Sequence, residues 1–289
     1  MSLYWYNGEP NFGDALSPLV CVRYLGQTDL SWARARKAAV AGIGSILDTM
    51  MLHRPCPFPK SALTPVRGLL SRSFRRPLNV WGSGLICRTS GAAGYVVLRK
   101  VRAFAVRGRR TLDELVSLGA LVNPRDDIAF GDPALLTPQL MPVARTRRYR
   151  LGFVPHVAMF GDGTASAFAR EHPEYRLIDP RLPPSDVITD IVSCEEVFSC
   201  SLHGLILADA YGVPNHWVGW THPWMSDADN AFKYLDYYSA VGESREPFRL
   251  SEPQTWKASS PIDGAKLDVV RGRLTDAAAA LTKRTEELA

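Results

Sequence analysis

Short apolar runs alternate with amphipathic stretches from one end of the chain to the other. This alternation is typical of parallel sheets whose strands are joined by covering helices. In the first half, the pattern predicts strands over residues 3–6, 38–43, 79–81, 102–106 and 127–130. It also predicts a helix that Asp14 caps and Gly26 ends, and a second helix over 109–118 that ends at Gly119.

A second alternating set follows a stretch at 137–148 that has two prolines, several arginines and no strand pattern. Its expected strands are 149–154, 175–178, 197–200 and 215–218, and its expected helices are 164–171, 185–194 (capped by Ser185), 205–211, 231–240 and 263–288. We therefore predict an α/β protein with two Rossmann-like domains that face a central cleft. The expected division is 1–140, 141–250, and a tail with a long helix at 251–289.

Residues 53–78 are rich in proline and arginine and lack clear periodicity. They predict a long surface loop with a short helical piece. Such a loop could contact a membrane or a lipid carrier, and an unstructured surface excursion explains the composition equally well.

The composition is that of an ordinary globular protein, with 46% hydrophobic and 22% charged residues among 289. The formal net charge of +5 favours anionic partners, but the basic residues fall into several short clusters, at 67–76, 99–110 and 145–150. Solvated arginines, an anionic substrate or a membrane surface would each account for them. Because no aromatic-interleaved basic stripe or known reader motif accompanies them, we expect no nucleic-acid partner.

Five cysteines, with no Cys-x-x-Cys pair, suggest neither a disulfide framework nor a zinc site. Reduced thiols are the simplest interpretation. The N-terminal residues carry no basic and apolar leader pattern, and no window approaches 18 uninterrupted apolar residues. We expect a cytoplasmic protein, and peripheral contact with the inner face of the membrane remains open.

The stretch 198–215 holds the strongest candidate for chemistry, because a strand runs there into a helix through a turn that contains His203. Such turns lie at the carboxyl edge of a sheet and point the free N–H groups of the helix at an anion. His203 is therefore placed where a titrating group can work beside a phosphate or carboxylate. Ser201 and Gly204 lie in the same turn and are candidate binding residues.

Other candidates lie near expected strand ends or helix starts. The expected binding residues are Asn11, Asp14, Gly82, Ser83, Gly84, Asp132, His156 and Lys233. Arg107 ends a strand, and its guanidinium could fork onto a carboxylate or phosphate. Each has an ordinary structural alternative: a capped helix start, an Asp-Pro turn, a loop histidine or a surface charge.

Several familiar signatures are missing or weak. The Gly42-x-Gly44 and Gly82-x-Gly84 turns lack the third glycine of a dinucleotide fingerprint, and there is no Walker-type Gly-Lys-Ser/Thr. The Asp227-Ala228-Asp229 triplet matches the Asp-x-Asp of many metal-dependent sugar transferases, but so short a pattern often arises by chance. We expect no cofactor and no metal site.

Taken together, the motifs resemble the polysaccharide pyruvyl transferase family. The elements, in order, are Asn-Phe-Gly-Asp from Asn11, Gly-Ser-Gly from Gly82, Val-Arg-Gly around Arg107, Gly-Asp-Pro-Ala-Leu-Leu around Asp132, and Ser-Leu-His-Gly around His203. The resemblance in order and spacing extends from about residue 3 to 240. The resemblance implies a fold similar to the GT-B glycosyltransferases, with pyruvate moved from phosphoenolpyruvate onto two sugar hydroxyls as a cyclic ketal.

The family's arginine and histidine of the phosphoenolpyruvate site match Arg107 and His203. The resemblance thus implies catalytic roles for both, with phosphoenolpyruvate as donor and a glycan or lipid-linked saccharide as acceptor. Two alternatives share the architecture. One is a GT-B-like glycosyltransferase that uses a nucleotide sugar, and the other is a non-catalytic glycan-binding or scaffold protein.

Overall fold

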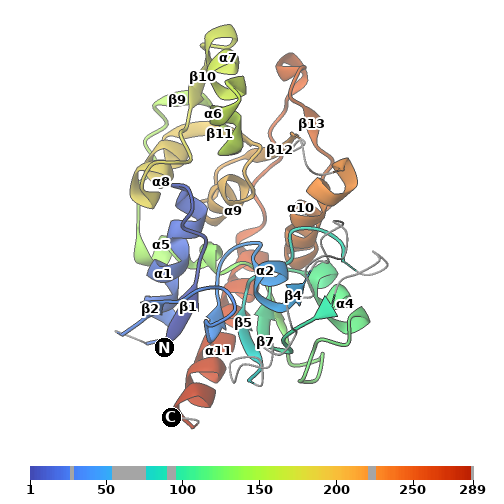
Figure 1. Ribbon diagram of the computed structural model, residues 1–289. Coiled ribbons are helices and arrows are strands. Elements are labelled where there is room, and N and C mark those ends of the chain that lie inside the picture. The colour runs from blue at the N-terminus through green and yellow to red at the C-terminus, as the bar shows by residue number, and fades with distance from the viewer. Residues whose placement is uncertain (27–28, 54–75, 90–95, 221–225, 288–289) are drawn as a thin grey trace, which may run out of the picture.

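The structure, a computed structural model, describes residues 1–26, 29–53, 76–89, 96–220 and 226–287. It contains two parallel sheets, one of six strands and one of five, which lie one above the other in Figure 1. The α/β class is confirmed, and the two sheets are consistent with two Rossmann-like domains. Cys56, most of the predicted loop over 53–78 and most of the 67–76 arginine cluster lie outside the described residues.

The first sheet has the order β2-β1-β3-β5-β7-β8. Its strands are β1 (Ser2–Tyr4), β2 (Ser31–Trp32), β3 (Val40–Ala41), β5 (Leu78–Trp81), β7 (Val101–Val106) and β8 (Ala129–Phe130). The short strands β4 (Leu52–His53) and β6 (Val96–Val97) form a separate antiparallel pair. Helices α1 (Phe12–Tyr24), α2 (Leu47–Met51) and α4 (Arg109–Ser117) connect the strands.

The second sheet has the order β10-β9-β11-β12-β13. Its strands are β9 (Tyr149–Val154), β10 (Tyr175–Leu177), β11 (Cys194–Ser199), β12 (Asn215–Gly219) and β13 (Phe248–Arg249). The segment between the sheets holds the 3-10 turn η2 (Pro133–Leu136) and helix α5 (Thr137–Leu140). Helices α6 (Ala158–Gly161), α7 (Thr164–Glu171), α8 (Pro184–Val192) and α9 (Leu202–Ala210) accompany the second sheet, with the 3-10 turn η3 (Pro253–Thr255) after β13.

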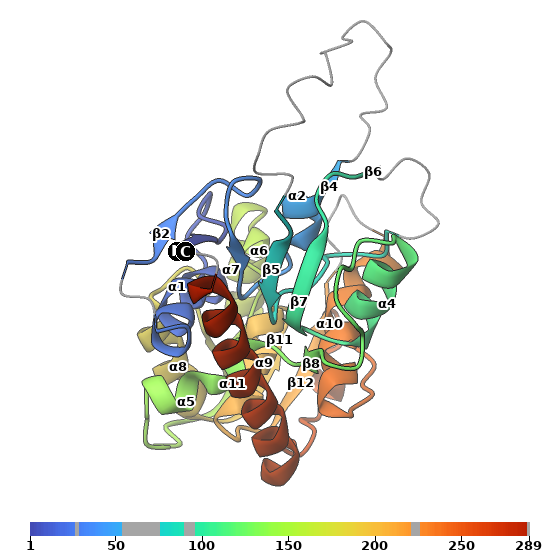
Figure 2. The same cartoon turned by 90° about the horizontal axis from the view of Figure 1, so that it is seen from below.

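Two helices from the C-terminal third of the chain return to the first sheet (Figures 1 and 2). Helix α10 (Asp227–Val241) packs beside α4, and helix α11 (Gly264–Glu286) crosses the sheet next to α1. Trp81 of β5 donates a 2.8 Å hydrogen bond to the carbonyl of Leu274 in α11. Apolar residues of α11 therefore complete a core that begins with strand residues such as Leu3.

Four predicted helix starts were wrong. Helix α10 begins at Asp227, four residues before the expected start at 231. Helix α1 begins at Phe12 and is capped by Asn11, whose side chain accepts from the amide of Gly13 at 3.0 Å, so Asp14 lies inside the first turn. Helix α8 has Pro183 at its N-cap position in place of the expected Ser185. Helix α9 begins at Leu202, so His203 is in its first turn rather than before it.

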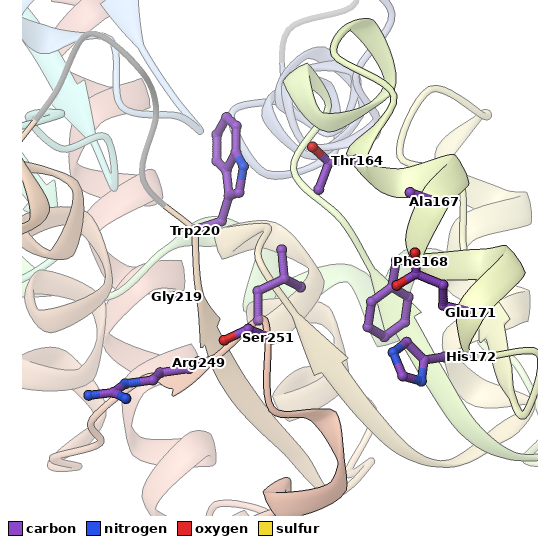
Figure 3. Close-up of a pocket in the computed structure, with 10 residues that line it drawn as sticks. Thr164, Ala167, Phe168, Glu171, His172, Gly219, Trp220, Arg249 and Ser251 are labelled. Carbon is purple, nitrogen blue, oxygen red and sulfur yellow. The ribbon is translucent and has the colours of Figure 1, made fainter.

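One face of the second sheet carries a cavity of about 620 Å³. It lies between helix α7 and the ends of strands β12 and β13, as Figure 3 shows. Beneath it is a cluster of aromatic residues that includes Phe153, Phe168 and Trp256. None of the site residues predicted from the sequence lines this cavity.

Candidate functional site

The carboxyl ends of both sheets contain a point where the strand order reverses. In the first sheet, β1 lies between β2 and β3, and in the second sheet, β9 lies between β10 and β11. The next two strands of the chain therefore pair on opposite sides of β1, and likewise of β9. Open α/β sheets bind ligands in the crevice at such points. Helix α1 follows β1, and helix α9 follows β11, which lies next to β9.

The starts of α1 and α9 lie against each other. The amide of Phe12 donates a 2.9 Å hydrogen bond to the carbonyl of Pro180, which precedes α8 of the second sheet. A Cβ on Gly13 would overlap the imidazole Nδ1 of His203. Only glycine leaves room there, so the two reversal points are brought together by a close approach of backbone to imidazole.

His203 faces a carboxylate from the first sheet. Its Nε2 is 3.7 Å from Oδ2 of Asp132, and the His203 side chain is 12% exposed, whereas that of Asp132 is 1% exposed. Among the described residues, neither of these two atoms has a hydrogen-bond partner. The other oxygen of Asp132 accepts from the amide of Ala134 at 2.9 Å, which fixes the carboxylate. Buried polar atoms without partners are rare, so this pair marks a place for a ligand or a moving proton.

Two more charged groups surround this position. Burial raises the pKa of Asp14 to about 6, and His203 and Lys233 partly oppose that rise. Burial, together with the nearby positive charge of Arg107, lowers the pKa of Lys233 to about 8. Lys233 is on α10 and is 9% exposed. Two strongly shifted groups that converge from separate helices, α1 and α10, are typical of functional sites.

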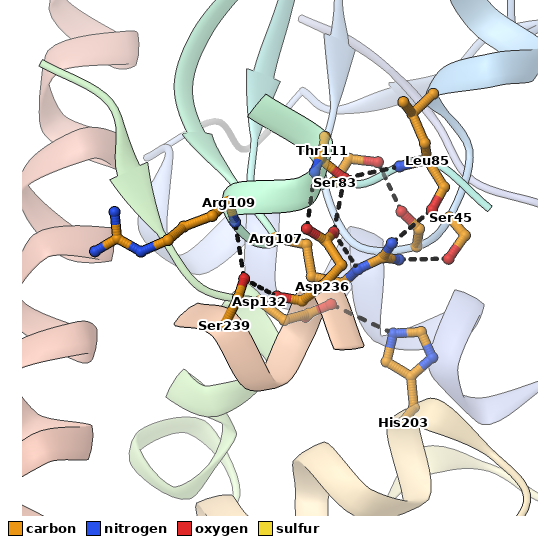
Figure 4. A network of polar contacts seen from close by, with 11 residues as sticks. Ser45, Ser83, Leu85, Arg107, Arg109, Thr111, Asp132, His203, Asp236 and Ser239 are labelled. Carbon is orange, nitrogen blue, oxygen red and sulfur yellow. Dashed lines mark hydrogen bonds and ion pairs between the residues drawn. The ribbon is translucent and has the colours of Figure 1, made fainter. Parts of the chain in front are cut away.

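Arg107 is part of the polar network that Figure 4 shows. Its side chain is 0% exposed, and its Nε is 3.0 Å from Oδ2 of Asp236 on α10. The two terminal nitrogens donate to Oγ of Ser45 and to the carbonyl of Leu85, each at 2.5 Å. The sequence predicted a guanidinium that reaches the edge of an open cleft, whereas here it is enclosed by protein groups that join the first sheet to α10.

The predicted Gly82-Ser83-Gly84 turn packs against the side chain of Arg107. Ser83 is fully buried and donates a 2.7 Å hydrogen bond to the carbonyl of Gly44. Gly82 has a φ of 86°, which favours glycine, and a Cβ on Gly84 would come within 2.5 Å of Cζ of Arg107. The turn therefore allows a close approach of the guanidinium, and Ser83 has no exposed side chain.

The remaining candidates lie at the edge of the second sheet. Ser201 occupies the N-cap position of α9, and its backbone amide and carbonyl both bond to Oγ of Ser199. A Cβ on Gly204 would overlap that same oxygen, so glycine lets α9 pack closely on β11. His156 follows β9, and its ring stacks on Trp220 at 4.9 Å and 20°.

Asp236 and its partner Thr111 were not predicted from the sequence. Both oxygens of Asp236 are engaged, by the amide of Thr111 at 2.8 Å and by the hydroxyl of Thr111 at 2.6 Å, in addition to Arg107. A signal was present, since Lys233 and Asp236 stand at helical spacing among four aromatic residues between 232 and 238. A helix that is apolar on all sides is buried, and charges within it require partners.

The Asp227-Ala228-Asp229 triplet lies in the first turn of α10. The amide of Asp229 donates to Oγ of Ser226 at 3.2 Å, and that hydroxyl donates to Oδ2 of Asp229 at 2.8 Å. Asp229 therefore takes part in capping the helix. No group of three or more metal-binding side chains was found within the described ranges. In the same ranges, no helix combines the length and the apolar character needed to cross a bilayer.

The sequence of this chain is similar to those of known proteins. The sequence model of the polysaccharide pyruvyl transferase family matches residues 66–222. The succinoglycan biosynthesis protein ExoV of Rhizobium meliloti (strain 1021) is 32% identical over 148 residues, which are 51% of this chain and 44% of that protein. An uncharacterized protein of Acanthamoeba polyphaga mimivirus is 25% identical over 191 residues, 63% of this chain and 61% of its own length. The matches thus span less than two thirds of either relative.

Proposed function

Because this chain belongs to the polysaccharide pyruvyl transferase family, we propose that it moves a pyruvyl group from phosphoenolpyruvate onto two hydroxyls of one sugar. The product is a cyclic ketal on a polysaccharide or its precursor. The acceptor is a glycan or a lipid-linked saccharide. The observation that carries the proposal is the 3.7 Å approach of His203 Nε2 to Asp132 Oδ2, where the reversal points of the two sheets meet.

Phosphoenolpyruvate carries a phosphate and a carboxylate and therefore requires positive charge and N–H donors. Lys233 supplies a cation that is buried beside Asp14 and Arg107. Helix α9, nine residues long, starts at Leu202, and the N–H groups of its first turn favour an anion. These features support a donor position between Lys233 and the start of α9.

The proposed reaction begins when a proton reaches C3 of the enol and makes C2 electrophilic. One sugar hydroxyl attacks C2 and loses its proton, the C2–O bond to phosphate breaks, and phosphate leaves. The second hydroxyl then attacks C2, loses its proton and closes the ketal ring. His203 carries protons in these steps, and Asp132 orients the imidazole and stabilises the positive charge that it gains.

We assign Arg107 a positioning role. Its ion pair with Asp236 holds α10 against the first sheet, and Lys233 lies three residues before Asp236 on the same helix. The arrangement keeps the ammonium group near His203 without requiring contact between Arg107 and the donor. Asn11 caps the helix that carries Asp14 and so positions that carboxylate.

The architecture proposed for this activity is GT-B-like, with domains at 1–140 and 141–250 and the residues at 251–289 as a tail. Support comes from two parallel sheets whose carboxyl ends converge and from α11, which returns from the second sheet to the first. We propose that the protein acts in the cytoplasm, where phosphoenolpyruvate is made, in solution or at the inner face of the membrane.

Ligand-dependent thermal unfolding tests the donor assignment. A ligand that binds only the folded protein raises its melting temperature, by an amount that grows with the ratio of concentration to Kd. We expect phosphoenolpyruvate to raise the melting temperature of the wild-type protein and to have little effect on Lys233→Met. Stabilisation by nucleoside diphosphates in place of phosphoenolpyruvate would favour a glycosyltransferase and contradict the proposal.

A further inference from the structure

The cavity beside α7 has the size of a ligand site. Its volume of about 620 Å³ lies within the range of roughly 300–1,000 Å³ usual for small-molecule pockets. One wall is α7, and the other is formed by the ends of β12 and β13 (Figure 3). None of the residues placed in the reaction above lines it.

The lining combines apolar and hydroxyl groups. Phe168, Leu250 and Trp220 supply apolar surface, and Thr164 and Ser251 supply hydroxyls. Pyranose rings have the matching character, since their C–H faces pack on aromatic and aliphatic groups while their edges form hydrogen bonds. The lining therefore fits a sugar better than it fits a lipid chain, which would leave the polar groups without partners.

The charges in the lining are of both signs. Glu171 and Arg249 both border the cavity, and Arg249 is 3.3 Å from the carboxylate of Glu252. His172 also borders it and has Glu174 at 3.5 Å. Neither sign dominates, so the lining favours a neutral ligand over an anionic one.

The cavity adjoins the proposed reaction site through Trp220. This residue follows the end of β12 and stacks on His156, which follows strand β9 of the second sheet. Its carbonyl accepts from the side chain of Asn230, which precedes Lys233 on the buried face of α10. Strand β11, which leads to His203, lies between β9 and β12. A chain of sugars that leaves the reaction site across Trp220 would therefore enter the cavity.

Resting on the proposed function, we infer that this cavity binds neutral sugar residues of the acceptor glycan that lie beyond the pair of hydroxyls that react. The site selects acceptors by the length and linkage of the glycan. It takes no part in donor binding or proton transfer.

Two tryptophan variants of α7 test the inference. Ala167 lines the cavity and is partly buried, so Ala167→Trp would fill the space without removing a polar group. Ser166 is exposed on the same helix and does not line the cavity, so Ser166→Trp is the matched control. Both variants should remain folded, which their melting temperatures check.

The first measurement is binding, without donor, to an array of neutral oligosaccharides with different linkages. We expect the wild type and Ser166→Trp to retain the same saccharides, and Ala167→Trp to bind them at least about tenfold more weakly, or 1.4 kcal/mol. If the wild type retains no saccharide, or if Ala167→Trp binds as the wild type does, the inference is overturned.

The second measurement is phosphate release from phosphoenolpyruvate with an acceptor monosaccharide and with a longer oligosaccharide that ends in the same sugar. Ala167→Trp should raise KM for the oligosaccharide at least about tenfold and leave kcat/KM for the monosaccharide unchanged. Absence of phosphate release from the wild type with every acceptor contradicts the proposed function. Array binding that Ala167→Trp abolishes would then still support the cavity as a sugar site.

Discussion

Arg107 at the end of β7 and Asp236 in α10 form an ion pair in which neither side chain has any exposed surface. They are 129 residues apart in the sequence, and their Nε and Oδ2 atoms are 3.0 Å apart. Removal of either partner would leave a buried charge without its counter-charge, which is far more costly than the loss of an exposed pair. The pair therefore fixes the position of α10, and with it that of Lys233.

Single replacement of either partner should destabilise the protein strongly. We expect Arg107→Ala and Asp236→Ala each to lower the free energy of unfolding by about 3–5 kcal/mol. The double variant should lose clearly less free energy of unfolding than the two single variants lose in sum, because it leaves no buried charge without a counter-charge. Urea unfolding measures all three variants, and strictly additive losses would show that the two residues do not act as a pair.

A double variant that replaces the ion pair by two apolar side chains distinguishes a positioning role of Arg107 from direct contact with the donor. Arg107→Met combined with Asp236→Leu removes both charges and keeps side-chain volume, so folding should be retained. The KM for phosphoenolpyruvate should then rise less than about tenfold. Loss of a direct charge-assisted hydrogen bond would cost on the order of 2 kcal/mol, about thirtyfold, and a rise of that size would assign Arg107 to the donor site.

The pKa of Lys233 predicts that kcat/KM for phosphoenolpyruvate falls at alkaline pH, which gives the pH profile an alkaline limb. Its pKa is about 8, because burial and Arg107 disfavour the charged form. Since the protonated form binds the anionic donor, kcat/KM should fall about tenfold per pH unit above pH 8, and this parameter reports groups of the free enzyme. Lys233→Arg should move the limb upward by more than one unit, because a guanidinium stays protonated. An unchanged limb in this variant would exclude Lys233 as the titrating group.

Asp14 should reduce stability at neutral pH. The pKa of Asp14 is raised from 3.8 to about 6 in the folded state, because burial favours the protonated carboxyl. The protonated carboxyl therefore contributes fully to the free energy of unfolding below pH 3.8, and this contribution is lost as the pH rises through 6. Asp14→Asn should therefore raise the free energy of unfolding at pH 7.5 by about 1–3 kcal/mol, with little gain at pH 4. Denaturant titrations at the two pH values measure this, and an equal effect at both would contradict the assignment. Lower activity of the stabilised variant would show that the carboxylate is kept for function.

Gly13 should be essential for activity although it has no side chain. A Cβ there would overlap Nδ1 of His203, so Gly13→Ala has to displace the imidazole. A small displacement of a catalytic group costs on the order of 10²-fold in rate. Gly272 in α11 has open space around its Cβ position, and Gly272→Ala is the matched control, with wild-type activity and slightly higher stability. Wild-type kcat in Gly13→Ala would mean that the close approach is not used.

Local patterns were enough to predict much of the fold. Strand β9 and helix α7 have the predicted bounds, because apolar alternation and helical spacing are properties of adjacent residues. The two-residue strands β2 and β13 were missed, because only their pairing with β1 and β12 defines them and they have no sequence pattern of their own. The start of α9 was placed too late because Ser201 and Gly204 together resemble a turn, whereas Gly204 in fact allows close packing on Ser199.

Only those parts of the candidate site that lie within one continuous segment of the chain could be predicted from the sequence. The strand-to-helix segment with His203 is local, and its position at a sheet edge follows from the βα pattern. The partner Asp236 comes from a helix far along the chain, and no spacing rule links it to Arg107. The burial of Arg107 was therefore not foreseen, because it depends on how α10 packs against the first sheet.

The central claim is that His203 moves the protons in pyruvyl transfer from phosphoenolpyruvate to a sugar. The direct measurement is acceptor-dependent phosphate release from phosphoenolpyruvate by the wild type and by His203→Ala, with galactosides, glucosides and mannosides as acceptors and product mass checked for a pyruvyl ketal. The account predicts release by the wild type and a rate about 10²- to 10⁴-fold lower in a His203→Ala protein that keeps the wild-type melting temperature. A variant that releases phosphate as fast as the wild type would contradict it.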